Sequence, residues 1–403
     1  MADGTDNFVT YVERAFESFD ERPLCALDSL VFSWLSYFRL PDDMDRLAGW
    51  EGVDVRELLR AECMDAMTEN LWDPRQSRAL LFAVAASPRF RGTRVCGYRV
   101  RSDEGAEEQF AACTFRLPSG GTYVAFRGTD STIVGWKEDF NMSFRCPVPS
   151  QAEAVSYLAE AAAALDGPLY CGGHSKGGNL AVYAATMAGK DVQERLERAF
   201  SHDGPGFNEA FLGQGPYCAL AAAGRIQKTL PRSSIIGMIF EAQEDYAVVD
   251  STGFSIFQHN PFSWVVDVDA RDFVYCEELS AGARYMDAAL AEWVSAVSPE
   301  ERGRFIDTLF NVLNVTGADR FAEIRDTWQV SVPKMLAALA QTDPDTRKFL
   351  TGTLAAFARC AFTPDMPGLP SLGELMGPGA GTDSGETDAI ADIGDTGDNA
   401  PVA

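Results

Sequence analysis

The chain has 403 residues, of which 46% are apolar, so it can hold one large domain or two smaller ones with an ordinary hydrophobic core. Its formal net charge of −25 argues against a protein that binds nucleic acid or an anionic membrane surface, because both need a basic face. No stretch approaches the uninterrupted apolar run of an integral membrane segment.

The cysteine and histidine content predicts neither disulfides nor a metal site. The nine cysteines are an odd number without a Cys-x-x-Cys pair, and several, such as Cys96, Cys113 and Cys171, lie in apolar runs. This distribution is typical of reduced, buried thiols. None of the three histidines lies near a cysteine pair, so zinc is not expected. The amino-terminal residues are polar and acidic and lack the features of a signal peptide, which favours a cytoplasmic protein.

The first part of the chain predicts helices followed by strands. Apolar residues at helical spacing predict helices at residues 7–18, 27–38, 55–63 and 77–86. Three runs with strand character follow at residues 93–100, 109–117 and 122–126, with a Pro-Ser-Gly-Gly hairpin turn between the last two.

In the middle of the chain, strands alternate with helices. A helix is expected at residues 151–165, and buried strands at residues 168–172, 199–201 and 234–240. This alternation predicts an α/β fold with a mostly parallel sheet and helices on both faces.

The last part of the chain predicts helices only. Ser298-Pro299-Glu300-Glu301 has a capping serine, a proline at the first helical position and a glutamate three residues after the cap. We therefore divide the chain into four parts. They are an amino-terminal helical segment (1–90), an α/β core (91–277), a helical subdomain (278–362) and an acidic, disordered tail (363–403) without a lysine or arginine.

The motif Gly173-His174-Ser175-Lys176-Gly177 lies where a predicted strand turns into a predicted helix. A G-x-S-x-G pattern in that position is typical of the nucleophile elbow of α/β-hydrolases, where the serine adopts a strained backbone conformation and small residues must flank it. The motif predicts Ser175 as a nucleophile.

A serine nucleophile needs a histidine as its base, and the chain offers three. At such a turn the side chain of His174 points away from the hydroxyl, and His202 comes too early for the usual order of nucleophile, acid and histidine. His259 lies in a loop after the last core strand and obeys that order. We therefore predict His259 as the base.

The acid that orients the base is predicted to be Asp245, because it follows the expected strand at residues 234–240 by a few positions. Asp203 is the alternative, since it also ends a strand, and Glu244 and Asp250 are weaker candidates.

An oxyanion hole needs two donors. One is the backbone N–H of Lys176, directly after the nucleophile, and the other is expected from Thr129, in the loop that follows the strand at residues 122–126.

These motifs resemble those of the class 3 (fungal-type) lipases and, more closely, those of a family of uncharacterised bacterial lipase-like proteins. The resemblance rests on segments spread over residues 25–315: Asp28, Leu35-Ser36-Tyr37, Tyr123 to Thr129 followed by Trp136 and Asp139, Gly173 to Gly178, Asp203 to Phe207, and Gln258 to Trp264. It implies the α/β-hydrolase fold, with Ser175, His259 and Asp245 as the catalytic residues and Thr129 with Lys176 at the oxyanion hole. It implies no particular substrate.

Lys176 and Asn179 depart from class 3 lipases, which usually carry an apolar residue and a small residue at these positions. A cation beside the nucleophile suits an anionic or polar acyl substrate. The alternative is that Lys176 pairs with a nearby acid and never meets the substrate.

The sequence thus predicts a serine hydrolase that cleaves the carboxylic ester of a small-molecule acyl or lipid-like substrate without a metal or organic cofactor. The alternative is a hydrolase fold that has lost its activity and serves as a binding or scaffold protein.

Overall fold

The computed structural model describes residues 5–69, 71–103, 108–129, 137–138, 141–142, 146–238, 245–253, 255–284, 298–318, 323, 327–342, 344, 347–348 and 351. The predicted acidic tail lies outside these residues.

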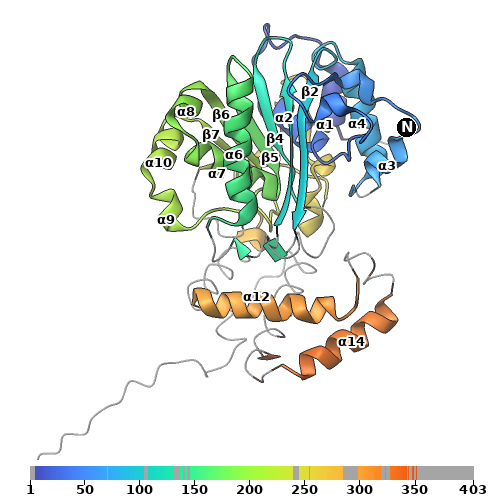
Figure 1. Cartoon of the computed structure of the whole chain (residues 1–403), viewed down its shortest axis with the longest axis vertical. Helices are drawn as coiled ribbons and strands as arrows, with labels where there is room; N and C mark the ends of the chain where they lie inside the picture. The colour runs from blue at the N-terminus through green and yellow to red at the C-terminus, as the bar shows by residue number, and fades with distance from the viewer. Residues whose placement is uncertain are drawn as a thin grey trace, which may run out of the picture.

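A single large sheet organises the described part of the chain (Figure 1). Its strands follow the spatial order β1-β2-β3-β4-β5-β6-β7-β8-β11. They span Val53–Asp54, Arg94–Asp103, Glu108–Arg116, Thr122–Phe126, Leu169–His174, Leu196–His202, Ile226–Pro231, Tyr246–Val249 and Tyr275–Cys276. Strands β4 to β8 are parallel, while β1 to β3 and β11 pair antiparallel. A two-stranded ribbon pairs β9 (Val266–Asp267) with β10 (Asp272–Phe273).

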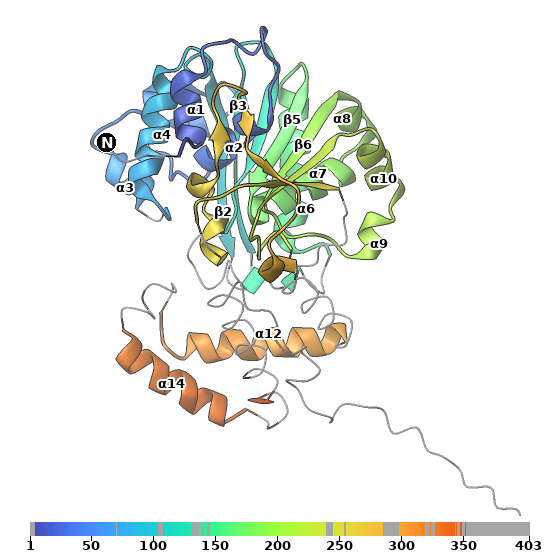
Figure 2. The same ribbon diagram turned by 180° about the vertical axis from the view of Figure 1, so that it is seen from behind.

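Helices cover both faces of the sheet (Figures 1 and 2). The α-helices before the carboxyl-terminal region span Phe8–Arg14 (α1), Ala26–Leu35 (α2), Met64–Thr68 (α3), Pro74–Ala86 (α4), Pro149–Ala164 (α6), Lys176–Met187 (α7), Lys190–Arg195 (α8), Glu209–Leu212 (α9) and Gly215–Ala222 (α10). Short 3₁₀ turns span Asp45–Leu47 (η1), Val55–Leu58 (η2), Ser255–His259 (η3) and Pro261–Ser263 (η4). The predicted α/β fold, a mostly parallel sheet flanked by helices, is confirmed.

Strand β4 shows how the two faces are built. Successive side chains of a strand point to opposite faces. Tyr123 and Ala125 accordingly pack in the core under α2, whereas Val124 and Phe126 pack in the core under α6 and α7. All four side chains are fully buried. The run therefore reads as continuously apolar in sequence, as central strands of a covered sheet do.

Asp28 and Arg89 form an ion pair inside the core between α2 and the segment after α4. Two nitrogens of the guanidinium donate to the carboxylate at 2.8 and 2.6 Å, and both side chains are buried. Asp28 also accepts a hydrogen bond from the backbone N–H of Cys25, the N-cap residue directly before α2. The acid in the first turn of this helix therefore both caps the helix and anchors the neighbouring segment.

Helices α12 (Pro299–Asn314) and α14 (Trp328–Ala340) lie beyond the edge of the sheet at which β4 to β7 end (Figures 1 and 2). The predicted cap is present: the Ser298 side chain accepts from the N–H of Glu301, and the Glu301 carboxylate accepts from the N–H of Ser298. An ion pair of 2.9 Å joins Lys137 to Asp307 of α12. The division into domains at residues 90, 277 and 362 stays a prediction.

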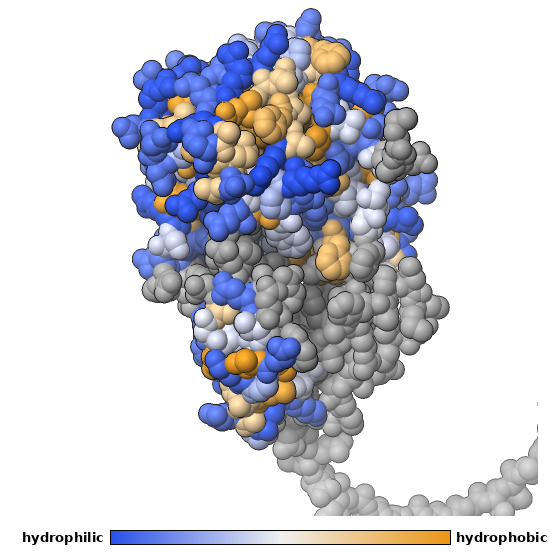
Figure 3. Space-filling model, turned by 90° about the vertical axis from the view of Figure 1, so that its right-hand side faces the viewer, coloured by the Kyte–Doolittle hydropathy of each residue, from blue (hydrophilic) through white to orange (hydrophobic). Residues whose placement is uncertain are grey.

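None of the helices in the described ranges combines the length and apolar composition needed to cross a bilayer. The surface over α1 and α4 carries a band of hydrophobic residues among hydrophilic ones (Figure 3). On these elements Phe16, just after α1, is 65% exposed and Phe82 of α4 is 54% exposed.

Candidate active site

Ser175 lies at the sharp turn between β5 and α7. Its backbone has φ 59° and ψ −136°, a conformation that is costly for a residue with a side chain. A Cβ atom at Gly173 would collide with the backbone of Gly177, and one at Gly177 would collide with the backbone of Phe126. The two flanking glycines are therefore required by close backbone approach, and the serine is held in its strained conformation at the carboxyl end of β5.

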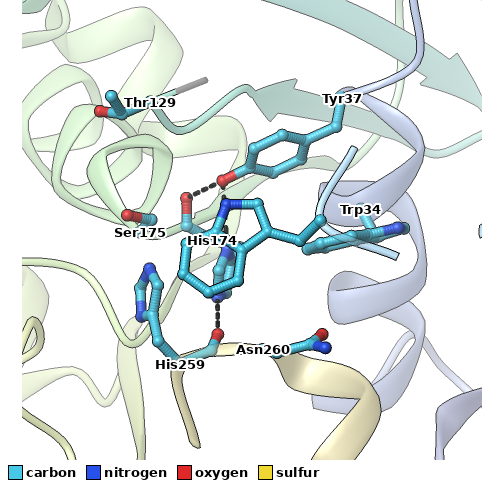
Figure 4. Close-up of a pocket in the computed structure, with 8 residues that line it drawn as sticks. Trp34, Tyr37, Thr129, His174, Ser175, His259 and Asn260 are labelled. Atoms are coloured by element: carbon cyan, nitrogen blue, oxygen red, sulfur yellow. Dashed lines mark hydrogen bonds between the residues drawn. The ribbon is translucent and has the colours of Figure 1, made fainter. Parts of the chain in front are cut away.

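His259 ends the 3₁₀ turn η3 and lies beside Ser175. Its imidazole is directed toward Ser175, which lies between His259 and Thr129 in the view of Figure 4. The Nδ1 atom of His259 lies 2.6 Å from Oδ2 of Asp203. Because a carboxylate only accepts hydrogen bonds, Nδ1 carries the proton and Nε2 is left free to accept one. The Ser175 hydroxyl makes no hydrogen bond with the described residues. The hydrogen bond between a catalytic serine and its histidine is often long or poorly aligned before a substrate binds.

Asp203 follows β6 and is fully buried. Its backbone has a φ of 51°, so it too leaves its strand at a sharp turn. The Oδ1 atom accepts hydrogen bonds from the Ser234 hydroxyl at 2.5 Å and from the Gly237 N–H at 3.1 Å. The carboxylate is therefore fixed by two donors on one oxygen while the other oxygen holds His259.

The structure does not bring Asp245, the acid predicted from sequence, to His259. Asp245 is exposed and directly precedes β8, so it lies at the amino end of a parallel strand. Ser175 and Asp203 lie at the carboxyl ends, which form the opposite edge of the sheet. The error came from the expected strand at residues 234–240. Its described part, residues 234–238, forms turns, and the strand is β7, eight residues earlier.

The two weaker acid candidates do not change this assignment. Asp250 accepts a hydrogen bond from the N–H of Ser251 at the end of β8, and Glu244 lies outside the described residues. Trp136 and Asp139, which contributed to the family resemblance, also lie outside them.

Thr129 follows β4, the neighbour of β5, and faces the same cavity as Ser175. The preceding Gly128 approaches so closely that a Cβ atom there would lie 2.5 Å from the carbonyl oxygen of His174 and 3.0 Å from Cβ of Ser175. Lys176 is the first residue of α7, so its backbone N–H lies in the turn whose N–H groups have no helical partner. Both predicted donors thus lie next to Ser175.

The Lys176 side chain is buried away from the cavity. Its Nζ donates to the carbonyl oxygen of Gln109 at 2.8 Å and pairs with Oε2 of Glu138 at 2.9 Å. Glu138 is buried as well and accepts further hydrogen bonds from the N–H groups of Gln109 and Ser150. This geometry agrees with the second interpretation of Lys176, in which the lysine pairs with an acid and does not meet a substrate.

His174 connects helix α2 to the loop that carries His259. Its Nε2 lies 2.8 Å from the carbonyl oxygen of His259, so Nε2 must donate. Its Nδ1 lies 3.1 Å from the hydroxyl of Tyr37, which follows α2. Burial, and secondarily the neighbouring His259, hold the pKa of His174 well below its usual value. A neutral His174 thus holds the backbone of His259 in place.

The rest of the loop around His259 is fixed by its own side chains. The indole N–H of the buried Trp264 donates to the carbonyl oxygen of Gln258 at 2.7 Å. The amide oxygen of Gln258 accepts from the N–H of Ser233, and Asn260 accepts from the N–H of Phe262. The segment from Gln258 to Trp264, which carried part of the family resemblance, is therefore a support for His259.

His202 is fully buried outside the cavity, and burial lowers its pKa to about 3. Its Nε2 lies 2.8 Å from the Ser29 hydroxyl, and its Nδ1 has no hydrogen-bond partner. Below pH 6.5 the unfolded chain protonates this residue while the folded chain does not, so the stability of the fold decreases as the pH is lowered. We expect His202 to lower the free energy of unfolding at pH 5 by about 2 kcal/mol relative to pH 7.

Denaturant unfolding at the two pH values should show a smaller loss for His202→Asn than for the wild type. In the wild type, the NMR signals of the His202 ring should not titrate between pH 5 and 8. Titration near pH 6.5 would contradict the burial argument.

Three aromatic side chains that the sequence did not reveal as site residues also line the cavity: Trp34, Tyr37 and Trp72. They come from α2, the residues after it and the loop before α4, far from Ser175 in sequence. Tyr37 had a signal, because Leu35-Ser36-Tyr37 belonged to the family resemblance. The isolated Trp72 had none.

The family described as Mbeg1-like matches residues 84–311. No curated protein matches the chain at a significant level. The match confirms the expected relation to a lipase-like family.

Three solved lipase structures are similar to the chain. A triacylglycerol lipase described as having a serine protease triad as its catalytic centre is 15% identical, with a TM-score of 0.35, over 56% of this chain and 80% of that one. The Rhizomucor miehei lipase in complex with its propeptide is 15% identical, with a TM-score of 0.29, over 51% and 74%. The lipase of Rhizopus microsporus var. chinensis is 16% identical, with a TM-score of 0.27, over 57% and 93%.

Proposed function

The chain belongs to the Mbeg1-like family, and we propose that it is a serine hydrolase that cleaves a carboxylic ester through an acyl-enzyme on Ser175. The observation that carries this proposal is the arrangement around the turn after β5. A strained serine is faced by an imidazole whose other nitrogen lies 2.6 Å from a buried carboxylate. A nucleophile, a base and an orienting acid in this order are the parts that acyl transfer requires.

In the proposed reaction the Ser175 oxygen attacks the ester carbonyl, and Nε2 of His259 takes the hydroxyl proton. Asp203 keeps the proton on Nδ1 and stabilises the imidazolium that forms. His259 then gives its proton to the leaving alcohol. A water molecule, activated by the same imidazole, attacks the acyl-enzyme and releases the carboxylic acid.

The negative oxygen of the tetrahedral intermediate would be stabilised by the backbone N–H of Lys176 and by Thr129. The N–H of Lys176 lies at the amino end of α7, where the helix dipole also favours negative charge. Thr129 lies beside Ser175 because Gly128 packs directly on the turn. Lys176 would contribute through its backbone alone, since its side chain is bound to Glu138.

A fluorophosphonate probe with peptide mapping tests the proposal, because such a probe reacts only with an activated hydroxyl. We expect the wild type to carry the label on the peptide that contains Ser175, and Ser175→Ala to carry none. Ser119→Ala, in the exposed turn after β3, is the matched control and should label like the wild type. Equal labelling of the wild type and Ser175→Ala would overturn the proposal. No labelling and no turnover of acyl esters would favour a catalytically inactive binding or scaffold protein.

A further inference from the structure

The cavity beside Ser175 is very small. Its volume is about 20 Å³, and the described residues that line it are Trp34, Tyr37, Trp72, Thr129, His174, Ser175, His259 and Asn260 (Figure 4). A space of this size holds about one water molecule, which is close to the size of a methyl group. Sites for larger ligands commonly measure about 300–1,000 Å³. The space next to the nucleophile therefore fits the methyl group of an acetyl ester and no long acyl chain.

Two of the aromatic walls are fixed. The buried indole of Trp34 donates its N–H to the Ser77 hydroxyl of α4 at 3.0 Å, and its ring stacks on Tyr37 with 5.0 Å between centroids. The Tyr37 hydroxyl lies 3.1 Å from both Nδ1 and the carbonyl oxygen of His174. Moving either ring would break hydrogen bonds that are buried at Trp34 and partly buried at Tyr37, so this side of the cavity cannot widen at low cost.

The third wall is Trp72, whose removal would break no hydrogen bond with the described residues. It lies between α3 and α4 and is 49% exposed. Its ring meets the imidazole of His259 edge-on, with 6.0 Å between centroids. Its indole N–H makes no hydrogen bond with the described residues. An exposed ring with one aromatic contact is the wall whose removal would enlarge the cavity without unfolding the core.

We propose that Trp72 determines the acyl specificity of this site and restricts it to esters with short acyl groups of about two to three carbons. The proposal rests on the serine hydrolase function proposed above. The acyl methyl group lies between the fixed rings of α2 and the indole of Trp72, and a longer chain collides with that indole. Trp72 lies outside the segment matched by the family, so this specificity belongs to the amino-terminal helical segment.

The test compares kcat/KM for p-nitrophenyl acetate, butanoate and octanoate in the wild type, Trp72→Ala and Trp72→Phe. We expect the wild type to prefer acetate over octanoate by at least roughly 100-fold, since even one misfitting methylene costs about tenfold or more. Trp72→Ala should raise the octanoate-to-acetate ratio by about tenfold or more, with Trp72→Phe between the two. Phe82→Ala, which removes an equally exposed ring from α4, is the matched control and should keep the wild-type ratio.

An octanoate-to-acetate ratio that is the same in Trp72→Ala and the wild type would overturn the proposal, as would a wild type that prefers octanoate. The failure of the two proposals can be distinguished. Ester turnover that depends on Ser175 but ignores Trp72 removes only the specificity proposal. A wild type that neither turns over acetate nor reacts with the fluorophosphonate probe removes the enzymatic function itself.

Discussion

Asp203→Asn is expected to lower kcat/KM for an acyl ester by about 10⁴-fold. The carboxylate of Asp203 holds the Nδ1 proton of His259 and leaves Nε2 free to act as a base. An asparagine amide can present its NH₂ group to Nδ1, which moves the imidazole proton to Nε2, where it blocks proton transfer from Ser175. The side chain keeps its size, so the fold should be retained. Steady-state kinetics, with circular dichroism as a check of folding, measure the effect.

Asp245→Asn is the matched control for this experiment. Asp245 is exposed at the amino end of β8, on the opposite edge of the sheet from Ser175. Its neutralisation should change kcat/KM by no more than about twofold, as is usual for surface substitutions. If Asp245→Asn abolished turnover while Asp203→Asn kept it, the assignment from sequence would be right and the geometry would not describe the active state.

The comparison of the two acids shows which part of the site the sequence could predict. Ser175, Lys176 and their flanking glycines form one continuous motif, and the backbone clashes at Gly173 and Gly177 explain why this local pattern suffices. The position of Thr129 was predictable because the strand before it is a short run that is apolar except for Thr122. These predictions needed only one strand and the turn that follows it.

The acid could not be assigned from the sequence because β7, the strand beside the one that precedes Asp203, does not have the apolar pattern of a buried strand. Strand β7 contains a lysine, Lys228, that is buried and donates to the carbonyl oxygen of Gly237. In sequence this strand reads as polar, whereas residues 234–238 read as apolar and buried. The turns formed by those residues supply Ser234 and Gly237 as hydrogen-bond donors to Asp203. These hydrogen bonds join residues that are far apart in the chain, and they override the local preference for a strand at residues 234–238. The sequence alone does not show them.

The aromatic walls were missed for a different reason. Trp34, Tyr37 and Trp72 reach Ser175 only because α2 packs on β4 and β5 and because the loop before α4 folds back over His259. No spacing in the sequence encodes these contacts. Helical periodicity correctly predicted a helix at this place in the chain, but it could not separate the residues that fill the core from those that line the cavity.

Lys176→Met is expected to lower the free energy of unfolding by about 3–5 kcal/mol, because it leaves the carboxylate of Glu138 buried without its cation. Both partners are essentially inaccessible to solvent, and the pair ties the first residue of α7 to the segment that follows Thr129. Denaturant unfolding measures the loss. The exposed pair between Arg78 and Asp65 provides the control, since Arg78→Met should cost no more than about 1 kcal/mol.

The double variant Lys176→Met with Glu138→Leu separates the charge from the packing. Replacing both partners of a buried pair by apolar residues removes the uncompensated charge, so the double variant should recover part of the stability that the single variant loses. The recovery is incomplete because the N–H groups of Gln109 and Ser150 still lose the acceptor that Glu138 provides. Because Nζ of Lys176 binds Gln109 and Glu138 and does not reach the cavity, the turnover ratio of anionic to neutral esters should be the same in the double variant and the wild type. A ratio that falls when the lysine is removed would mean that its charge acts on the substrate, as the first interpretation of this residue held.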